Sequence, residues 1–227
     1  MARPIRNHLA LAVLGCLSER PMHPYEISTT LRSRNKEGSI KLNYGSLYSV
    51  VESLQKHGLI TARETTRAGR RPERTVYEIT PAGEHELEDW LSELISKPVR
   101  DFTALEAGLS LMGYLPPDEV ARLLDLRAIQ LRIDQRAVDA ELAETRAMGL
   151  PDMFVVEGMY RNSVLAAELA FVTSLAEGLR DGSFGGVKLW RRLHELRDAG
   201  TSWAEILDNP VGHLGEEAAV LNVQPSD

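Results

Sequence analysis

Apolar residues recur every three or four positions through most of the chain, which is the spacing of one face of an α-helix. In the first 60 residues this pattern predicts three helices, at residues 5–17, from residue 24 onward, and at residues 43–56. In the third helix Leu47, Val51 and Leu54 share one face, whereas the opposite face carries serines and Lys56. Gly58 follows at the position where a left-handed residue commonly ends a helix. Taken alone this is an ordinary surface helix, but its small, hydroxylated outer face also suits an anionic partner.

The pattern then changes to that of a β-hairpin. Residues 60–66 and 75–80 are β-branched or alternating, which predicts two strands. The turn between them is rich in arginine: Arg67, Arg70, Arg71 and Arg74. Three helices followed by a strand, a basic loop and a strand form the order of a winged helix-turn-helix, whose second motif helix enters the major groove. Arginine-rich loops are usually solvated surface, but here helix and loop have the spacing of one DNA-binding module, which favours DNA binding.

The rest of the chain is helical, so the predicted fold class is mainly α with a small β wing. Helices are expected at residues 80–97, 102–112, 116–148, 152–180 and 187–196, and from about residue 200. The two long helices form an antiparallel hairpin too apolar to be covered within one small domain, so a partner subunit is expected. The alternative is that the hairpin packs on the first and fourth helices of its own chain. Packing within the chain and pairing with a second subunit can also occur together. The predicted dimerisation residues are Val120, Leu124, Leu131, Val138, Leu142, Tyr160, Val164 and Phe171.

These elements predict three regions. Residues 1–98 form a winged helix-turn-helix DNA-binding domain, residues 99–186 a helical dimerisation domain, and residues 187–227 a C-terminal extension. Within the extension, residues 200–207 weakly resemble the first half of a second helix-turn-helix. The residues that follow are too acidic and broken for a recognition helix, so we reject that interpretation. From Asn222 onward we expect disorder.

Charge is distributed unevenly between the two halves. The chain as a whole has a net charge of −7, which by itself argues against a nucleic-acid partner. Residues 1–80, however, contain 13 Lys+Arg and 7 Asp+Glu, a balance of +6, and the remaining 13 Lys+Arg and 26 Asp+Glu give −13. The asymmetry predicts a basic module joined to an acidic one, with a nucleic-acid surface on the first.

Other function classes find little support in the sequence. No apolar run is long enough to span a membrane, and the N-terminal segment lacks the features of a signal peptide, so no membrane association is expected. Cys16, the single cysteine, excludes an intrachain disulfide, fits a cytoplasmic location and is expected in the core. Neither a phosphate-binding glycine loop nor a metal-binding cluster is present, so we expect no catalytic residues, cofactor or metal. The alternative function is a helical interaction or adaptor protein without DNA specificity.

Several ordered motifs resemble those of the PadR family of bacterial transcriptional regulators. They lie at residues 11–17, 21–27, 45–48, 58–60, 69–72 and 76–83, and the resemblance covers roughly residues 5–95. Two positions depart from the family pattern: Pro24 replaces a glycine, and Ser49 follows a tyrosine where proline is common. The resemblance implies a winged helix-turn-helix fold. It also implies a homodimer that binds a pseudo-palindromic operator, usually as a repressor.

The resemblance also implies which residues meet their ligands. DNA contacts are expected from Asn43, Tyr44, Ser46, Tyr48, Ser49, Arg70, Arg71 and Arg74. Lys41 is a further phosphate contact, whereas Tyr25 either reaches a phosphate or packs against the third helix. Some relatives bind aromatic effectors in the C-terminal half. Such a pocket could be lined by Phe102, Met112, Met153, Tyr160 and Phe171, although side chains of this kind are more often plain core.

Overall fold

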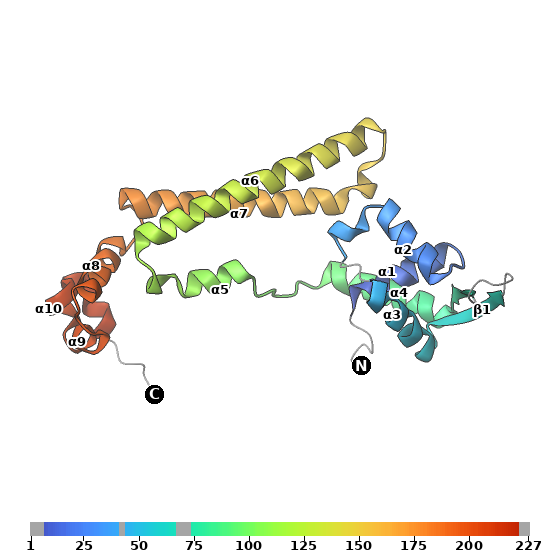
Figure 1. The fold of residues 1–227 in the computed structure, drawn as a ribbon, viewed down its shortest axis with the longest axis horizontal. Coiled ribbons are helices and arrows are strands. Elements are labelled where there is room, and N and C mark those ends of the chain that lie inside the picture. The colour runs from blue at the N-terminus through green and yellow to red at the C-terminus, as the bar shows by residue number, and fades with distance from the viewer. Residues whose placement is uncertain (1–6, 41–43, 67–73, 223–227) are drawn as a thin grey trace. The chain divides into compact units, whose positions relative to one another are not determined.

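The computed structural model describes residues 7–40, 44–66 and 74–222, and divides into two compact units, Met1–Arg100 and Asp101–Asp227 (Figure 1). The described residues are mainly helical with a single antiparallel pair of strands, which confirms the predicted fold class. No helix among them is both long and apolar enough to cross a membrane.

The N-terminal unit is a winged helix. Its elements are α1 (His8–Glu19), α2 (Pro24–Ser33), a 3₁₀ turn (Lys36–Gly38), α3 (Tyr44–Lys56), β1 (Ile60–Thr66), β2 (Arg74–Ile79) and α4 (Pro81–Ser96). The start of α2 is well defined, because His23 and Glu26 form a capping box around Pro24 at the first helical position. Proline in place of the family's glycine therefore supports this helix start.

The core of the N-terminal unit lies between α1, α2, α3 and the sheet. Leu14, Ile27 and Leu54 have no exposed surface, and Cys16 is buried beside them, as predicted. Burial raises the pKa of the Cys16 thiol, which keeps it protonated. The sequence pattern did not reveal one pairing: Met22 exchanges two backbone hydrogen bonds with Tyr77, each 3.0 Å long, and so ties the α1–α2 loop to β2.

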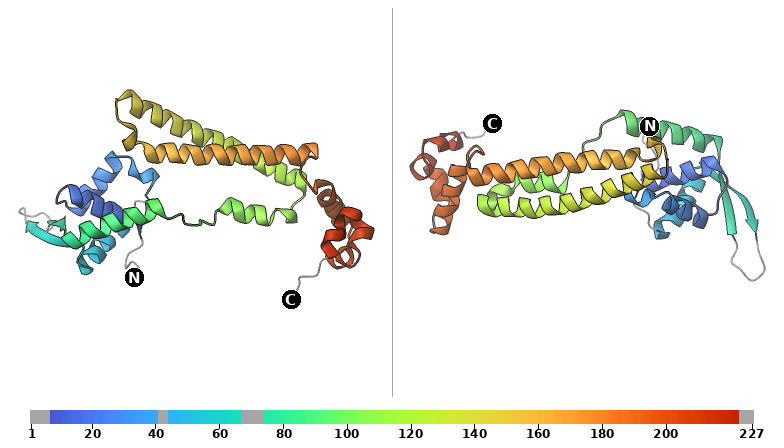
Figure 2. Two further views of the ribbon diagram at one scale, coloured as in Figure 1. Left: turned by 180° about the vertical axis from the view of Figure 1, so that it is seen from behind. Right: turned by 90° about the horizontal axis from the view of Figure 1, so that it is seen from above.

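The C-terminal unit is built on a long helical hairpin. Its elements are α5 (Ala104–Ser110), η2 (Met112–Tyr114), α6 (Pro117–Ala147), η3 (Asp152–Phe154), α7 (Val156–Asp181), α8 (Val187–Asp198), α9 (Trp203–Asp208), α10 (Pro210–Leu214) and η4 (Glu216–Asn222). Helices α6 and α7 pack against each other and run alongside one another in the right-hand view of Figure 2. Polar pairs fix their register: Arg127 with Glu168 at 2.6 Å, and Asn162 with Asp139 at 2.7 Å.

The residues after the hairpin form a small module with its own core. Helices α8, α9 and α10 and η4 enclose Leu193, Ile206, Leu214 and Ala218. We refer to residues 187–222 as the C-terminal module. After residue 207 the sequence analysis made no prediction of further helix, and the structure shows that Asn209 caps a short helix and that helical turns continue to Asn222. Residues 223–227, where we expected disorder, lie outside the described part.

Candidate nucleic-acid interface

Helix α3 separates an apolar inner side from a polar outer side. Leu47, Val51 and Leu54 are at most 3 % exposed and anchor the helix to the core of the unit. The outer side presents Tyr48, which is 51 % exposed, and Ser49. The first turn contains no acidic residue, so nothing opposes the positive end of the helix dipole there. An outer face of this kind can accept a phosphate or a base edge.

Ser49 has an exposed hydroxyl near the start of α3. The hydroxyl of Ser49 donates to the carbonyl of Ser46 at 2.9 Å, an exposed bond within the helix that a DNA contact could replace. Ser46 is only partly exposed. Tyr25, at the start of α2, is 66 % exposed, so the structure favours the solvent-facing alternative over packing against α3. Two exposed tyrosines therefore belong to the two helices of the helix-turn-helix.

Several predicted DNA contacts cannot be placed. Lys41, Asn43, Arg67, Arg70 and Arg71 lie outside the described residues, and for Tyr44 and Arg74 the description covers the backbone alone. Strand β1 ends at Thr66 and β2 begins at Arg74, so the arginine-rich segment is the connection between the two paired strands. Its role remains a prediction from the sequence.

The structure adds one basic residue that the sequence analysis missed. The register of the hairpin shifts between Ala62 and Glu64, which marks a β-bulge at Arg63. The side chain of Arg63 is 60 % exposed and lies 3.7 Å from Glu78 on the paired strand. An exposed ion pair of this length is weak, so phosphate could compete for the guanidinium. Simple alternation along a strand gives no signal for a bulge.

Tyr77 connects the hairpin to α3 electrostatically. Its pKa is raised, chiefly by burial and secondly by the nearby carboxylate of Glu52 on α3. The phenol therefore stays protonated at neutral pH, and the underside of the hairpin carries no added negative charge.

The predicted dimerisation residues fall into two groups. Within one chain, the α6 members are buried against α7, so they hold the hairpin together and are not available to a partner: Val120, Leu124, Leu131, Val138 and Leu142. The α7 members Tyr160, Val164 and Phe171 are exposed. A second exposed apolar row lies on α6, at Leu123, Leu126, Ile129 and Ile133. The sequence analysis followed a single apolar stripe along α6, whereas Leu126 and Ile133 lie on the opposite side of the same helix.

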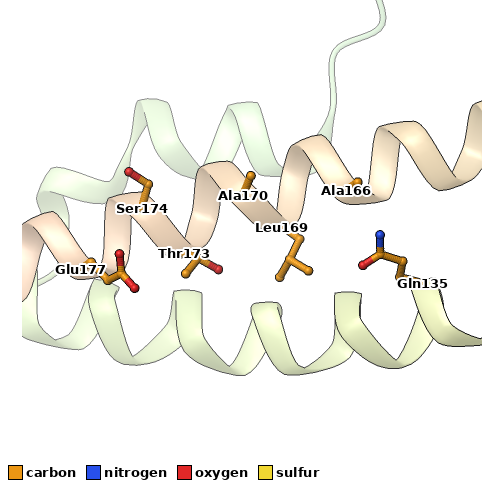
Figure 3. A pocket seen from close by; sticks show the side chains of 7 residues that line it. All are labelled: Gln135, Ala166, Leu169, Ala170, Thr173, Ser174 and Glu177. Carbon is orange, nitrogen blue, oxygen red and sulfur yellow. The ribbon is translucent and has the colours of Figure 1, made fainter.

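The predicted effector-pocket residues do not meet within one chain. Met112 precedes α6 and Met153 follows it, and a 31-residue helix spans about 46 Å. Phe102, Tyr160 and Phe171 are all more than half exposed. A hollow of about 360 Å³ does lie along α7, but it is lined by other residues: Gln135, Ala166, Leu169, Ala170, Thr173, Ser174 and Glu177. Figure 3 shows Leu169 and Thr173 pointing from α7 toward α6.

Metal-binding chemistry finds no support in the described residues, which include no group of three or more His, Cys, Asp or Glu side chains able to hold an ion.

Comparison with known proteins agrees with this geometry. Residues 13–89 match the family described as "Transcriptional regulator PadR-like family". No curated protein matches the sequence. Among solved structures, Bacillus subtilis PadR in complex with operator DNA is 21 % identical with a TM-score of 0.54, over 73 % of this chain and 99 % of that one. The same protein in complex with p-coumaric acid is 17 % identical with a TM-score of 0.58, over 78 % and 97 %.

A third structure, the PadR-like transcriptional regulator BC1756 from Bacillus cereus, is 14 % identical with a TM-score of 0.52, over 77 % of this chain and 99 % of that one. At these identities the solved structures show a shared fold, and the family assignment depends on the match at residues 13–89. That match covers most of the winged helix, so this part of the chain is similar to the PadR-like family of transcriptional regulators.

Proposed function

We propose that the chain is a dimeric transcriptional repressor that binds a pseudo-palindromic DNA operator. The observation that carries the proposal is the outer face of α3, where Tyr48 and Ser49 are exposed and no acid is present in the first turn. In a helix-turn-helix this helix enters the major groove, and the arginine-rich segment after β1 supplies phosphate or minor-groove contacts.

The exposed apolar rows of the hairpin support the dimer. Four half-exposed aliphatic side chains on α6 and three exposed apolar residues on α7 would lie in water in a single chain. Large apolar side chains gathered on exposed helix faces are typical of interaction sites. A second copy would cover it and would present two recognition helices to two half-sites, about 34–36 Å apart when they face the same side of the duplex.

Release by a small aromatic or hydrophobic effector is the regulatory part of the proposal. The solved PadR complex with p-coumaric acid shows that a protein of this fold can bind a phenolic acid. In this chain the candidate residues Met112 and Met153 lie at opposite ends of α6, so only a site shared between two subunits could unite them.

The proposed function is tested by a gel shift with the DNA upstream of the protein's own gene, at two salt concentrations, against unrelated DNA of equal length. Replacing Arg70 and Arg71 by Ala should weaken binding and reduce the salt slope by about 2, since each phosphate contact contributes about 0.9. Arg132→Ala with Arg136→Ala is the control, because it removes the same charge from exposed positions of α6. If DNA binding depended neither on the salt concentration nor on the DNA sequence, the result would support the adaptor alternative instead.

An enzymatic role is not part of the proposal. The PadR-like family consists of transcriptional regulators and is not enzymatic in general. This chain matches that family at residues 13–89, which cover most of its winged helix.

A further inference from the structure

The hollow beside α7 is formed by small side chains. Ala166, Ala170 and Ser174 recur every fourth residue, so they lie on one side of the helix and leave space above it. Leu169 adds an apolar wall that points toward α6 (Figure 3). The lining extends from Ala166 to Glu177, about 16 Å along the helix axis. With a volume of about 360 Å³, this space suits an elongated small molecule.

Polar side chains lie at both ends of this apolar row. Figure 3 shows Gln135, from α6, near Ala166, and the carboxylate of Glu177 at the other end. Neither Gln135 nor Glu177 has a hydrogen bond or an ion pair from its side chain to another residue in the described part of the chain. Of the described residues that line the hollow, Glu177 alone is ionisable. The hollow therefore has one negative charge, at one of its ends.

A further polar group, the hydroxyl of Thr173, lies buried in the wall of the hollow. Its oxygen, Oγ1, has no hydrogen-bond partner among the described residues. A buried hydroxyl without a partner is unfavourable, so a molecule that offers it a hydrogen bond is bound more firmly. Threonine in a helix has two accessible rotamers, and the hydroxyl can therefore turn toward the hollow.

The hollow and the exposed apolar row of α7 lie on different sides of the helix. Successive residues of an α-helix are about 100° apart, so Ala170 is turned that far from Phe171 of the row. A second subunit that packs on Tyr160, Val164 and Phe171 therefore does not need to cover the hollow. The lining residues all belong to one subunit.

We propose that the hollow binds an elongated organic amine, whose apolar body lies on the small side chains and whose protonated amino group lies near Glu177. The carboxylate attracts a cation and repels an anion at this end. The amide of Gln135 can donate to or accept from a polar group at the other end. The inference concerns binding by a single subunit and does not rest on the proposed function.

Three indole compounds with the same ring test the class of ligand: tryptamine is a cation, tryptophol is neutral and indole-3-acetate is an anion. Methyl NMR of the full-length protein, labelled at alanine, leucine and threonine, locates each compound and measures its affinity. Tryptamine should shift the methyl signals of the lining, from Ala166, Leu169, Ala170 and Thr173. The signal of Ala143, which is exposed on α6 outside the hollow, should not move. Tryptamine should bind about two- to fivefold more tightly than tryptophol, the range of an exposed ion pair, and indole-3-acetate should bind most weakly.

Glu177→Gln tests the origin of the charge preference. In this variant tryptamine and tryptophol should bind equally, because the attraction to the amino group is lost. Glu144→Gln is the matched control, since it removes the same charge from an exposed position of α6, and it should keep the preference. Arg132, exposed and three residues before Gln135 on α6, is the cation that could select an anion instead. Arg132→Gln should leave the order of the three affinities unchanged.

Ala170→Leu tests the space itself. The larger side chain should weaken binding of tryptamine by at least about tenfold, because it fills the hollow. Ala143→Leu adds the same group at an exposed position outside the hollow and should have no effect. Circular dichroism checks that both variants fold, and Glu177→Gln keeps the proposal testable if Ala170→Leu does not.

Three results would overturn the proposal. The first is that millimolar tryptamine shifts none of the methyl signals of the lining. The second is that indole-3-acetate binds as tightly as tryptamine. The third is that Ala170→Leu converts a wild-type dimer into monomers by light scattering, because the hollow would then belong to the contact between two subunits.

Discussion

Gly83 is the position where one added methyl group should damage the winged helix most. It lies in the first turn of α4 and is buried against the end of the α3–β1 connection. A Cβ there would overlap the carbonyl oxygen of Leu59 and come within 2.8 Å of the Cγ1 of Ile79. The same carbonyl accepts a hydrogen bond of 3.1 Å from the amide of Thr80, which caps α4. The obstacle is backbone that is itself held in place, so it cannot move aside freely.

The magnitude follows from two opposing effects. Forcing a methyl group into a filled site costs about 1–3 kcal/mol, and weakening the Thr80–Leu59 bond adds about 1 kcal/mol. The higher helix propensity of alanine offsets at most about 1 kcal/mol of this loss of stability. Gly83→Ala should therefore destabilise the unit by about 1–3 kcal/mol. For a domain of 60–100 residues, each kcal/mol lowers the midpoint of thermal unfolding by about 4–8 °C.

Gly15→Ala is the matched control, because a Cβ at Gly15 in the middle of α1 meets no atom within 4 Å. This variant should be more stable than the wild type by about 0.5–1 kcal/mol. Urea and thermal unfolding followed by circular dichroism measure both. The reasoning is refuted if Gly83→Ala stays within about 0.5 kcal/mol of the wild type, or if the two variants shift in the same direction.

Three further predictions concern the hairpin, the α3 surface and acid stability. Ile133→Glu should give monomers with an intact hairpin, whereas Leu131→Glu, at a position only 7 % exposed, should unfold the hairpin; light scattering and circular dichroism separate these results. Tyr48→Ala should lower operator affinity by about tenfold without changing the unfolding midpoint, since this side chain is half-exposed. The hydrogen bond from Arg34 lowers the pKa of Glu19, so the pair stabilises the fold above the ordinary glutamate pKa and that stability is lost as the pH falls through the lowered value. The urea midpoints of wild type and Glu19→Gln should thus differ modestly at neutral pH and converge in acid.

Local patterns were sufficient for the longer helices and for the hairpin of strands. Leu47, Val51 and Leu54 predicted the buried side of α3 because a helix repeats every 3.6 residues whatever surrounds it. The start of α4 could likewise be read from Thr80 and Pro81, since a cap and a proline act within one turn.

The candidate site was less completely predictable. The buried stripe of α3 also shows which residues face away from the core. The sequence pattern therefore already implied that Tyr48 is exposed. The bulge at Arg63 and the pairing of Met22 with Tyr77 were not, because each depends on which residue of another segment lies opposite. The predicted dimerisation residues on α6 illustrate the same point, because within one chain they are buried in the cores that α6 and α7 share. A stripe shows that a face is apolar, but not whether the chain's own helix or another subunit covers it.

The sequence by itself determined the order of elements, the uneven charge and the family motifs, since these depend on residues close together in the chain. Only the tertiary structure decided which apolar face of α6 is covered by α7, and that α8 holds the turn before α6. Those contacts join residues 41 to 81 positions apart, such as Arg127 with Glu168 and His194 with Gly113. Periodicity carries no information about such pairs, because their distance is set by how whole elements pack and not by any local preference of the chain.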